Sequence, residues 1–219
     1  MIITCIAHAM FRLELDCGLT IVTDPVDAGS GYPVRPGSAD AVLVSHHHHD
    51  HDALDAVTGC RQVIDRTCER LDLGGAKLTA IQGWHDDVQG AKRGSTLLFL
   101  LEAEGLRIVH LGDLGTLPDE KQIAALAPAD VLMVPVGGFY TIDAAQAKET
   151  ARLLNARVIL PMHYRTKYNP DWPIADAAAF TSLYPEDRVS RQPLMRVTAG
   201  DLAVQPPVCL LAPTLGAGF

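Results

Sequence analysis

The sequence contains no run of about 20 apolar residues, which is the length that a membrane-spanning helix requires. Its first residues, 1–8, lack the basic segment and the long apolar stretch of a secretory signal peptide. Cysteine is scarce as well. The five cysteines are an odd number and include no C-x-x-C pair, so a disulfide framework is not predicted. Together these absences predict a cytoplasmic protein that does not enter a membrane.

Basic residues are also in deficit, with 18 Lys and Arg against 26 Asp and Glu and a formal net charge of -8. A protein that binds nucleic acid needs clustered basic side chains to displace counterions from the phosphates, so no nucleic-acid partner is expected. The G-x-S-x-G motif of serine hydrolases is missing too. A hydrolytic activity in this chain would therefore need another source of nucleophile.

Apolar residues, in contrast, make up 48% of the 219 residues, which is enough for a substantial buried core. No tandem repeat is visible, and the last residues of the chain are rich in Pro and Gly. We therefore predict a single domain over residues 1–204, followed by an irregular C-terminal tail over residues 205–219.

The hydrophobic pattern predicts a chain in which strands and helices alternate. Short strands are expected at 2–7, 11–16 and 19–23, and a loop dense in Pro and Gly at 28–38. Apolar runs typical of strands buried on both faces follow at 41–45, 106–111, 131–136 and 156–160. Helices are expected at 119–126, 143–154 and 174–183. This order is typical of an α/β fold.

Metal-binding residue types follow several of the predicted buried strands. His46 comes directly after the run at 41–45, Asp113 follows the run at 106–111, and His163 follows the run at 156–160. Ligands of open α/β sheets gather beyond the carboxyl ends of such strands. These three side chains are therefore expected to converge, although they are far apart in the sequence.

Residues 45–52 read Ser-His-His-His-His-Asp-His-Asp and contain the pattern H-x-H-x-D-H at His46, His48, Asp50 and His51. Imidazole and carboxylate groups suit zinc and neighbouring first-row metals. The tract is internal and follows a predicted buried strand, so a metal site is favoured over an expression tag or a simple His-rich segment. His47 and His49 share the i, i+2 spacing. Only the series that starts at His46 places an Asp-His pair at its end, and we expect the other two to be bystanders or to support the ligands.

With these residues the sequence resembles the metallo-β-lactamase superfamily, over residues 8–165. His85, Asp113 and His163 match the later motifs of that family in the right order. The resemblance is strongest to a branch of metal-dependent hydrolases that includes ascorbate-phosphate lactonases. It rests on the stretches AHA at 7–9, HLGD at 110–113, PVGG at 135–138 and PMHY at 161–164.

The resemblance implies a four-layer αββα sandwich that binds two divalent ions. Zn is the default for a His-rich site, and Mn occurs in relatives. A hydroxide held by both ions would then attack a small substrate. We assign Asp50 and Asp113 as catalytic carboxylates. The implied ligands are His46, His48 and His85 for the first ion, Asp50, His51 and His163 for the second, and Asp113 between them.

Some members of the superfamily are excluded by the residues present. Iron-dependent redox members carry H-x-E-x-D, whereas this chain has His48 at the position of the glutamate. The helical domain of glyoxalase-type relatives and the basic arm of tRNA-processing relatives do not fit a chain of 219 residues with a net charge of -8. Hydrolysis of a small ester, lactone, amide or phosphodiester remains, and the alternative is a catalytically idle protein that keeps its metals for structure or sensing.

Basic residues close to the predicted ligands suggest an anionic substrate. Arg165 and Lys167 follow His163, and Lys92 and Arg93 follow His85. A cation near developing negative charge would stabilise the transition state. We therefore name Arg93, Arg165 and Lys167 as substrate-binding candidates. The roles of two further histidines stay open: His110 is either a core residue or a support for the ligands, and His8 is expected near the same rim.

Overall fold

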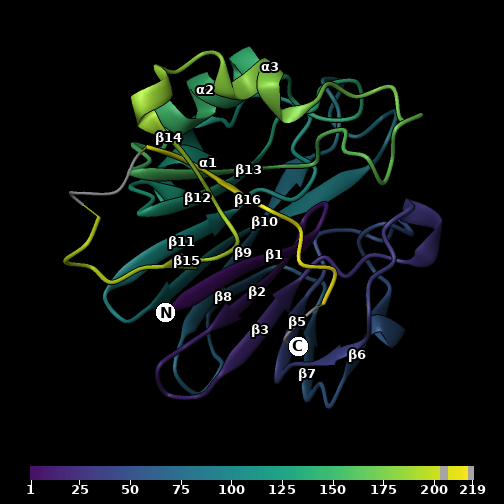
Figure 1. Cartoon of the computed structure of the whole chain (residues 1–219). Helices are drawn as coiled ribbons and strands as arrows, with labels where there is room; N and C mark the ends of the chain where they lie inside the picture. The colour runs from purple at the N-terminus through teal and green to yellow at the C-terminus, as the bar shows by residue number, and fades with distance from the viewer. Residues whose placement is uncertain (203–206, 217–219) are drawn as a thin grey trace.

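Two β-sheets lie face to face in the centre of the protein, in a computed structural model that describes residues 1–202 and 207–216 (Figure 1). Within these residues the smaller sheet has six strands in the order β15-β1-β2-β3-β5-β7. In that order they are Met195–Arg196, Ile2–Ala7, Met10–Glu14, Thr20–Thr23, Ala41–Leu43 and Gln62–Ile64. β1, β2 and β3 are antiparallel neighbours, whereas β5 runs parallel to β3 and β7.

The larger sheet has eight strands among the described residues, in the order β14-β16-β13-β12-β11-β10-β9-β8. In that order they are Val189–Gln192, Val208–Leu211, Val158–Met162, Val131–Pro135, Leu106–His110, Ser95–Ala103, Lys77–Trp84 and Cys68–Asp72. The strands from β14 to β11 are parallel, and β8 to β11 are antiparallel. β12 and β13 are buried at every residue, as their continuous apolar runs predict.

The core forms three apolar layers, because successive side chains of a strand point to opposite faces of its sheet. In β10, Phe99 and its alternate neighbours contact the smaller sheet, whereas Leu98 and Leu100 contact the helices. A third layer covers the outer face of the smaller sheet and includes the fully buried Tyr32. The central strands of both sheets are thus buried on both faces, whereas edge strands such as β8 and β7 are largely exposed.

Three α-helices cover the outer face of the larger sheet: α1 is Glu120–Leu126, α2 is Ala144–Leu153 and α3 is Ala177–Thr181. Asp119 and Asp143 cap α1 and α2 with the reciprocal hydrogen bonds of a capping box, and Asp176 caps α3. Figure 1 shows α2 and α3 on the larger sheet, at the side away from the smaller one. The predicted strands and helices thus occur, with small shifts at their ends.

The predicted four-layer α/β sandwich is confirmed, but its outer layer over the smaller sheet is made of loops in the described part of the chain. These loops contain the 3-10 turns η1 (Ala28–Ser30) and η2 (Leu54–Ala56) and the two-stranded pair β4 (Gly37–Ser38) and β6 (Val57–Thr58). A further 3-10 turn, η3 (Glu186–Arg188), precedes β14. Pro25, Pro33 and Pro36 disfavour a helix in the loop between β3 and β5, because a proline inside a helix removes a hydrogen bond and clashes with the preceding turn.

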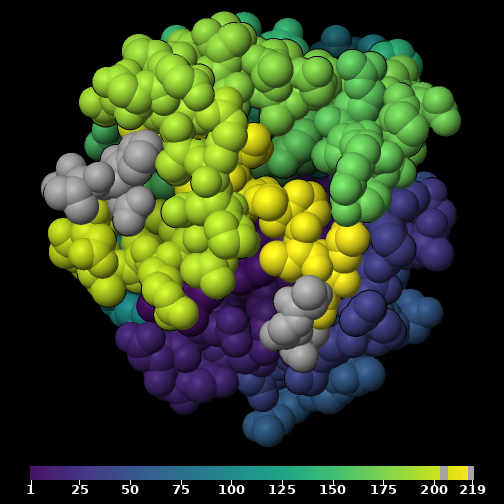
Figure 2. All heavy atoms as spheres, in the orientation of Figure 1, coloured from purple at the N-terminus to yellow at the C-terminus, as the bar shows by residue number. Residues whose placement is uncertain are grey.

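The prediction of an irregular tail is wrong for residues 208–211, which form β16 between β13 and β14. The apolar run Val208–Leu211 outweighs the prolines around it, because it fills a parallel position in the larger sheet. The chain then crosses to the smaller sheet, where Thr214 and Leu215 donate backbone N–H bonds of 3.0 Å to Cys5 and Ile6. Figure 2 shows this segment in yellow between the N-terminal half and the green helical region. Residues 205–206 and 217–219 of the predicted tail lie outside the described residues.

Candidate metal centre

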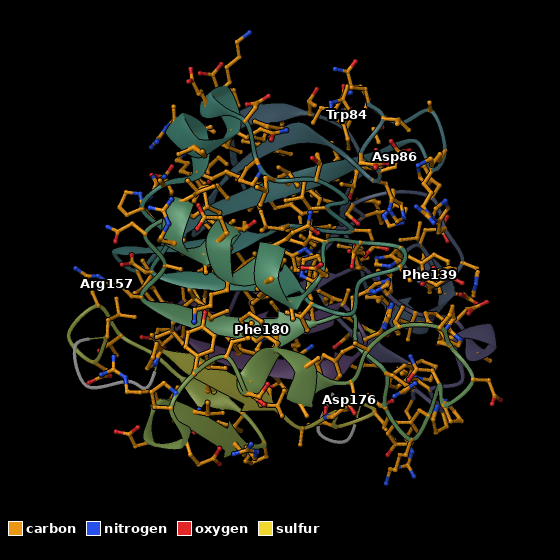
Figure 3. The ribbon with its side chains drawn as sticks, turned by 90° about the horizontal axis from the view of Figure 1, so that it is seen from above. Trp84, Asp86, Phe139, Arg157, Asp176 and Phe180 are labelled. Atoms are coloured by element: carbon orange, nitrogen blue, oxygen red, sulfur yellow. The ribbon has the colours of Figure 1, made fainter. Side chains whose placement is uncertain are left out.

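Loops from both sheets meet at one end of the molecule, beyond the carboxyl ends of β1, β5, β11 and β13. Figure 3 places Asp86 and Phe139 at this end and Arg157, which precedes β13, at the opposite end. The loop after β5 carries the histidine tract and the loop after β11 carries Asp113. The expected convergence at the strand ends is therefore what the structure has.

His46, His48 and His85 form a first cluster of nitrogen donors. His46 Nε2 lies 3.0 Å from His48 Nδ1, and the ring centres of His48 and His85 are 5.2 Å apart. One nitrogen from each of the three rings lies within 4.8 Å of the others. Such a spacing allows all three to contact a single ion.

Asp50, His51 and His163 form a second cluster, and His8 joins it. His51 Nε2 is 3.6 Å from Asp50 Oδ2, and the rings of His51 and His163 are stacked at 5.9 Å. His8 Nε2 is 3.5 Å from Asp50 Oδ2. One ligand atom from each of these four residues lies within 4.8 Å of the others. Sequence reasoning placed His8 only near the rim, because a single histidine in a hairpin has no ligand spacing to reveal it.

Asp113 lies between the two clusters and is almost fully buried. Its Oδ2 is 3.0 Å from His163 Nε2 and 3.4 Å from His85 Nε2. Its Oδ1 is 3.3 Å from His51 Nε2, and His46 Nε2 is 3.9 Å from Oδ2. One carboxylate therefore faces histidines of both clusters, as a bridging ligand would.

Asp24 supports the second cluster, and the sequence reasoning missed it. It follows β3 and lies wholly buried with φ of 39°, a conformation in which a residue other than glycine is strained. Asp24 Oδ2 accepts from His51 Nδ1 at 2.9 Å and from the Ser45 hydroxyl at 2.7 Å, while Oδ1 accepts from the Ser45 N–H at 2.7 Å. Asp24 thereby leaves His51 Nε2 free to face the site. An aspartate directly after a strand was the available signal.

Two glycines allow the loops to approach this closely. A Cβ on Gly112 would lie 2.4 Å from Thr96 Oγ1 and 2.7 Å from Ser45 Cβ, and the φ of Gly112 is 48°. A Cβ on Gly137 would lie 2.3 Å from the carbonyl oxygen of His163. Since real Cβ atoms do not come this close, both positions require glycine. The HLGD and PVGG stretches thus contribute close packing next to Asp113 and His163.

The remaining histidines lie outside the two clusters. His47 and His49 are exposed and face Asp52 at 3.3 Å and Asp27 at 3.1 Å. His110 is buried, with Nε2 3.1 Å from the Ala9 carbonyl and Nδ1 accepting from the Gly112 N–H at 3.1 Å. Both nitrogens of His110 are therefore satisfied, and the ring holds the backbone next to Asp113.

Burial and neighbouring charges set the protonation of the site. Burial lowers the pKa of His46 to about 3, with a contribution from His51, and burial also lowers the pKa of His85. Neutral imidazole is the form that binds metals. Burial opposes ionisation of Asp113, but His163 and His51 hold its pKa well below the usual value. Burial would lower the pKa of His51, yet Asp113 and Asp24 raise it well above its usual range. The carboxylates therefore attract positive charge to the centre.

The donors fit divalent metal ions. His51 Nε2 and Asp113 Oδ1 are buried and face each other at 3.3 Å, yet within the described residues neither makes a hydrogen bond of good geometry. Buried polar atoms without partners are costly and rare, and a cation between them would satisfy both. Imidazole nitrogens and carboxylate oxygens are also the donors that zinc and neighbouring metals prefer.

A pocket of about 610 Å³ opens over both clusters. Its floor contains His48, His85, Asp113 and His163, and its wall contains Tyr140 and Trp172. This volume lies within the range of roughly 300–1,000 Å³ that small-molecule sites have. The site can thus admit a small ligand next to the clustered donors.

None of the three substrate-binding candidates is among the residues that line this pocket, but Arg93 contacts one that is. The Arg93 guanidinium lies 5.5 Å from the ring centre of Tyr140, which lines the wall. Lys167 lines a different cavity, over the ring of Tyr168. Arg165 is exposed outside the pocket lining, and its N–H donates to the Ala175 carbonyl at 2.8 Å. Closeness to His163 in the sequence therefore does not place the side chains of Arg165 and Lys167 in the pocket lining.

This fold, with its clustered histidines and aspartates, defines a metallo-β-lactamase type of protein. The family model for the beta-lactamase superfamily domain matches residues 2–163, and the chain belongs to this superfamily. It is 31% identical over 194 residues to a UPF0173 metal-dependent hydrolase of Archaeoglobus fulgidus, covering 75% of this chain and 83% of the relative. A UPF0173 metal-dependent hydrolase of Carboxydothermus hydrogenoformans is 30% identical, with 81% and 89% covered.

A crystal structure from Thermotoga maritima is similar over nearly the whole chain. That protein is described as a Zn-dependent hydrolase of the metallo-beta-lactamase superfamily. It shares 34% sequence identity and a TM-score of 0.77, with 96% of this chain and 97% of that chain covered. Because the coverage reaches beyond residue 163, the similarity includes the C-terminal part of the larger sheet.

Proposed function

We propose that this protein is a metal-dependent hydrolase that uses two divalent ions at the described centre. Membership of the superfamily and the similarity to metal-dependent hydrolases support the general activity. The observation that carries the two-ion proposal is Asp113, whose buried carboxylate lies within 3.9 Å of histidines from both clusters. A single tetrahedral ion has too few positions for all of these donors.

In this proposal the two clusters hold one ion each. His46, His48 and His85 would bind the first ion, Asp50, His51 and His163 the second, and Asp113 both. Zn is the expected metal, with Mn as the alternative. Two bound ions would supply Lewis acidity and lower the pKa of a water molecule toward neutrality.

The chain itself would orient the reactants. Asp50 lines the pocket, and its carboxylate would orient an attacking water by accepting a hydrogen bond from it. Burial opposes its ionisation, but His8 and His51 lower the pKa of Asp50, so the carboxylate stays ionised across the working range. Tyr140 and Trp172 form a wall that removes bulk water from one side of a bound substrate. A small ester, lactone, amide or phosphodiester would fit such a site.

For the substrate we propose a small anionic molecule whose charged group lies next to Arg93. In the described part of the chain, no salt bridge joins the Arg93 guanidinium to a carboxylate, and its Cζ lies over the ring of Tyr140 at 5.5 Å from the ring centre. Lys92, in contrast, is paired with Asp87 at 3.0 Å. A guanidinium free of an ion pair at the pocket wall can bind a carboxylate or phosphate with two parallel hydrogen bonds.

A panel of generic esters, lactones and phosphodiesters tests the activity. We expect turnover that is lost with a chelator and restored by Zn or Mn. Metal binding without turnover of any member would instead favour the alternative, an idle metal-binding protein with a structural or sensing role.

Arg93→Ala tests the anionic substrate. We expect KM to rise roughly tenfold or more for an anionic substrate, because a charged hydrogen bond is lost, with little change for a neutral ester of the same reacting group. Arg165→Ala is the matched control: neither arginine is among the residues that line the pocket, but the Arg93 guanidinium contacts the lining residue Tyr140. Equal effects of Arg93→Ala on both substrates would refute the anion proposal and leave the hydrolase proposal standing.

A further inference from the structure

His8 is a buried histidine in the turn between β1 and β2. Its side chain has no exposed surface, and neither Nδ1 nor Nε2 makes a hydrogen bond in the described structure. It occupies the first position of the two-residue turn between β1 and β2, with a φ of 53°. A positive φ is uncommon outside glycine, although asparagine, aspartate and histidine adopt it more often than other residues. This backbone conformation combined with a buried ring that makes no hydrogen bond of good geometry points to a function.

The ring of His8 is aimed at the second cluster. Its Nε2 is 3.5 Å from Asp50 Oδ2, and its ring centre is 4.1 Å from that of His163 and 5.6 Å from that of His51. The backbone fixes this position, because the His8 carbonyl accepts the His163 N–H at 3.4 Å. The turn of the smaller sheet is thereby held against the end of β13 in the larger one.

We propose that His8 is an additional ligand of the second ion, through Nε2. The inference rests on the proposed two-ion centre. Four donors within 4.8 Å of one another, from His8, Asp50, His51 and His163, then surround the second position besides Asp113. The proposed site of the first ion has three histidines, and one of them, His48, is exposed. The second ion is therefore the more enclosed of the two, and it joins the first hairpin to the larger sheet.

The competing explanation is that His8 only orients Asp50 through a hydrogen bond from Nε2. A glutamine can replace such a hydrogen bond, because its amide nitrogen reaches a position similar to Nε2, but it is a poor substitute for a histidine ligand. An asparagine tolerates the left-handed backbone of this turn and is too short to reach Asp50. His8→Gln and His8→Asn therefore distinguish the two roles. If His8→Gln misfolds, His8→Asn still allows the test, because asparagine is compatible with the backbone of this turn.

The test uses full-length protein titrated with Co²⁺ and followed by proton NMR. Each histidine bound to Co²⁺ gives a strongly shifted, exchangeable ring N–H signal, which a merely positioning histidine does not give. Competition with a chelator measures the affinity of each ion. His47→Gln is the matched control, because His47 lies in the same rim and faces Asp52 instead of the clusters. Circular dichroism of the metal-free variants verifies that they are folded.

We expect both His8 variants to lose one shifted signal and to bind the second Co²⁺ roughly tenfold or more weakly, while the first ion and the control stay unchanged. A His8→Gln protein with all wild-type signals and affinities would overturn the inference and leave His8 as a support for Asp50. If wild-type protein bound only one ion, both this inference and the two-ion proposal would fail. If the wild-type protein binds two ions and turns over normally, and the His8 variants show the same signals and affinities, only the inference about His8 is refuted.

Discussion

Substitution of Asp24 by asparagine should weaken binding of the second ion without touching a predicted ligand. Asp24 Oδ2 accepts from His51 Nδ1 at 2.9 Å and from the Ser45 hydroxyl at 2.7 Å. An asparagine amide has one oxygen, and Oδ1 is already required by the Ser45 N–H at 2.7 Å. The amide NH2 would therefore face His51, which can accept from it only when the His51 proton sits on Nε2.

That change of tautomer removes the lone pair that His51 would offer to a metal. Supporting groups of this kind typically change metal affinity by about 10–100-fold, which corresponds to roughly 1.4–2.7 kcal/mol. If His51 instead keeps its proton on Nδ1, two donors face each other in a wholly buried place, and the folded protein loses about 1–3 kcal/mol. Both outcomes are measurable, and the structure requires at least one of them.

Metal affinity is measured by competition with a chromogenic chelator, and stability by denaturant unfolding of the metal-free protein. Ser45→Ala is the matched control, because it removes a hydroxyl that contacts Asp24 at 2.7 Å and His46 Nδ1, in the first cluster, at 2.9 Å, and it keeps both the Asp24 carboxylate and its contact with His51. We expect the control to retain the wild-type affinity for the second ion within a few-fold. Wild-type affinity together with wild-type stability in Asp24→Asn would refute the assignment of Asp24 as the group that orients His51.

Three further predictions concern the ligands and the packing around them. Asp113→Ala should lower occupancy at both metal positions, measured by elemental analysis, and loss of one ion only would make Asp113 a terminal ligand. In the histidine tract, His46→Ala and His48→Ala should each abolish hydrolysis, measured as turnover. His47→Ala and His49→Ala should leave the metal content near normal. The reverse pattern would shift the ligands by one residue. Gly112→Ala should lower the free energy of unfolding by about 2–4 kcal/mol, because its Cβ would clash with Thr96 and Ser45. Gly18→Ala, with φ of 90° and open space around it, should cost only the backbone strain, and equal losses would rule out the clash.

The C-terminal segment shows what prediction from local sequence patterns cannot reach. Its prolines and glycines predicted an irregular tail, yet Val208–Leu211 pairs with β13 and β14, and the next residues bond to Cys5 and Ile6. A four-residue apolar run becomes a strand only where a sheet offers an open position. That position is created by residues distant in the sequence, so no local pattern can reveal it. The loop between β3 and β5, over the smaller sheet, is different: its prolines disfavour a helix through a local effect on the backbone, which can be read from the sequence.

The sequence by itself determined the fold class and the chemistry of the candidate metal ligands. Buried strands need continuous apolar runs, and H-x-H-x-D-H supplies donors at fixed local spacing, so both can be recognised in the sequence. The tertiary structure decided the rest. It left Arg165 and Lys167 outside the pocket lining, placed Arg93 against Tyr140 of the pocket wall, and placed His8 and Asp24 against the second cluster. Each of these outcomes depends on the path of the backbone between elements from two different sheets. Loops can follow many paths of similar local conformational free energy, and only the packing of the complete chain selects one.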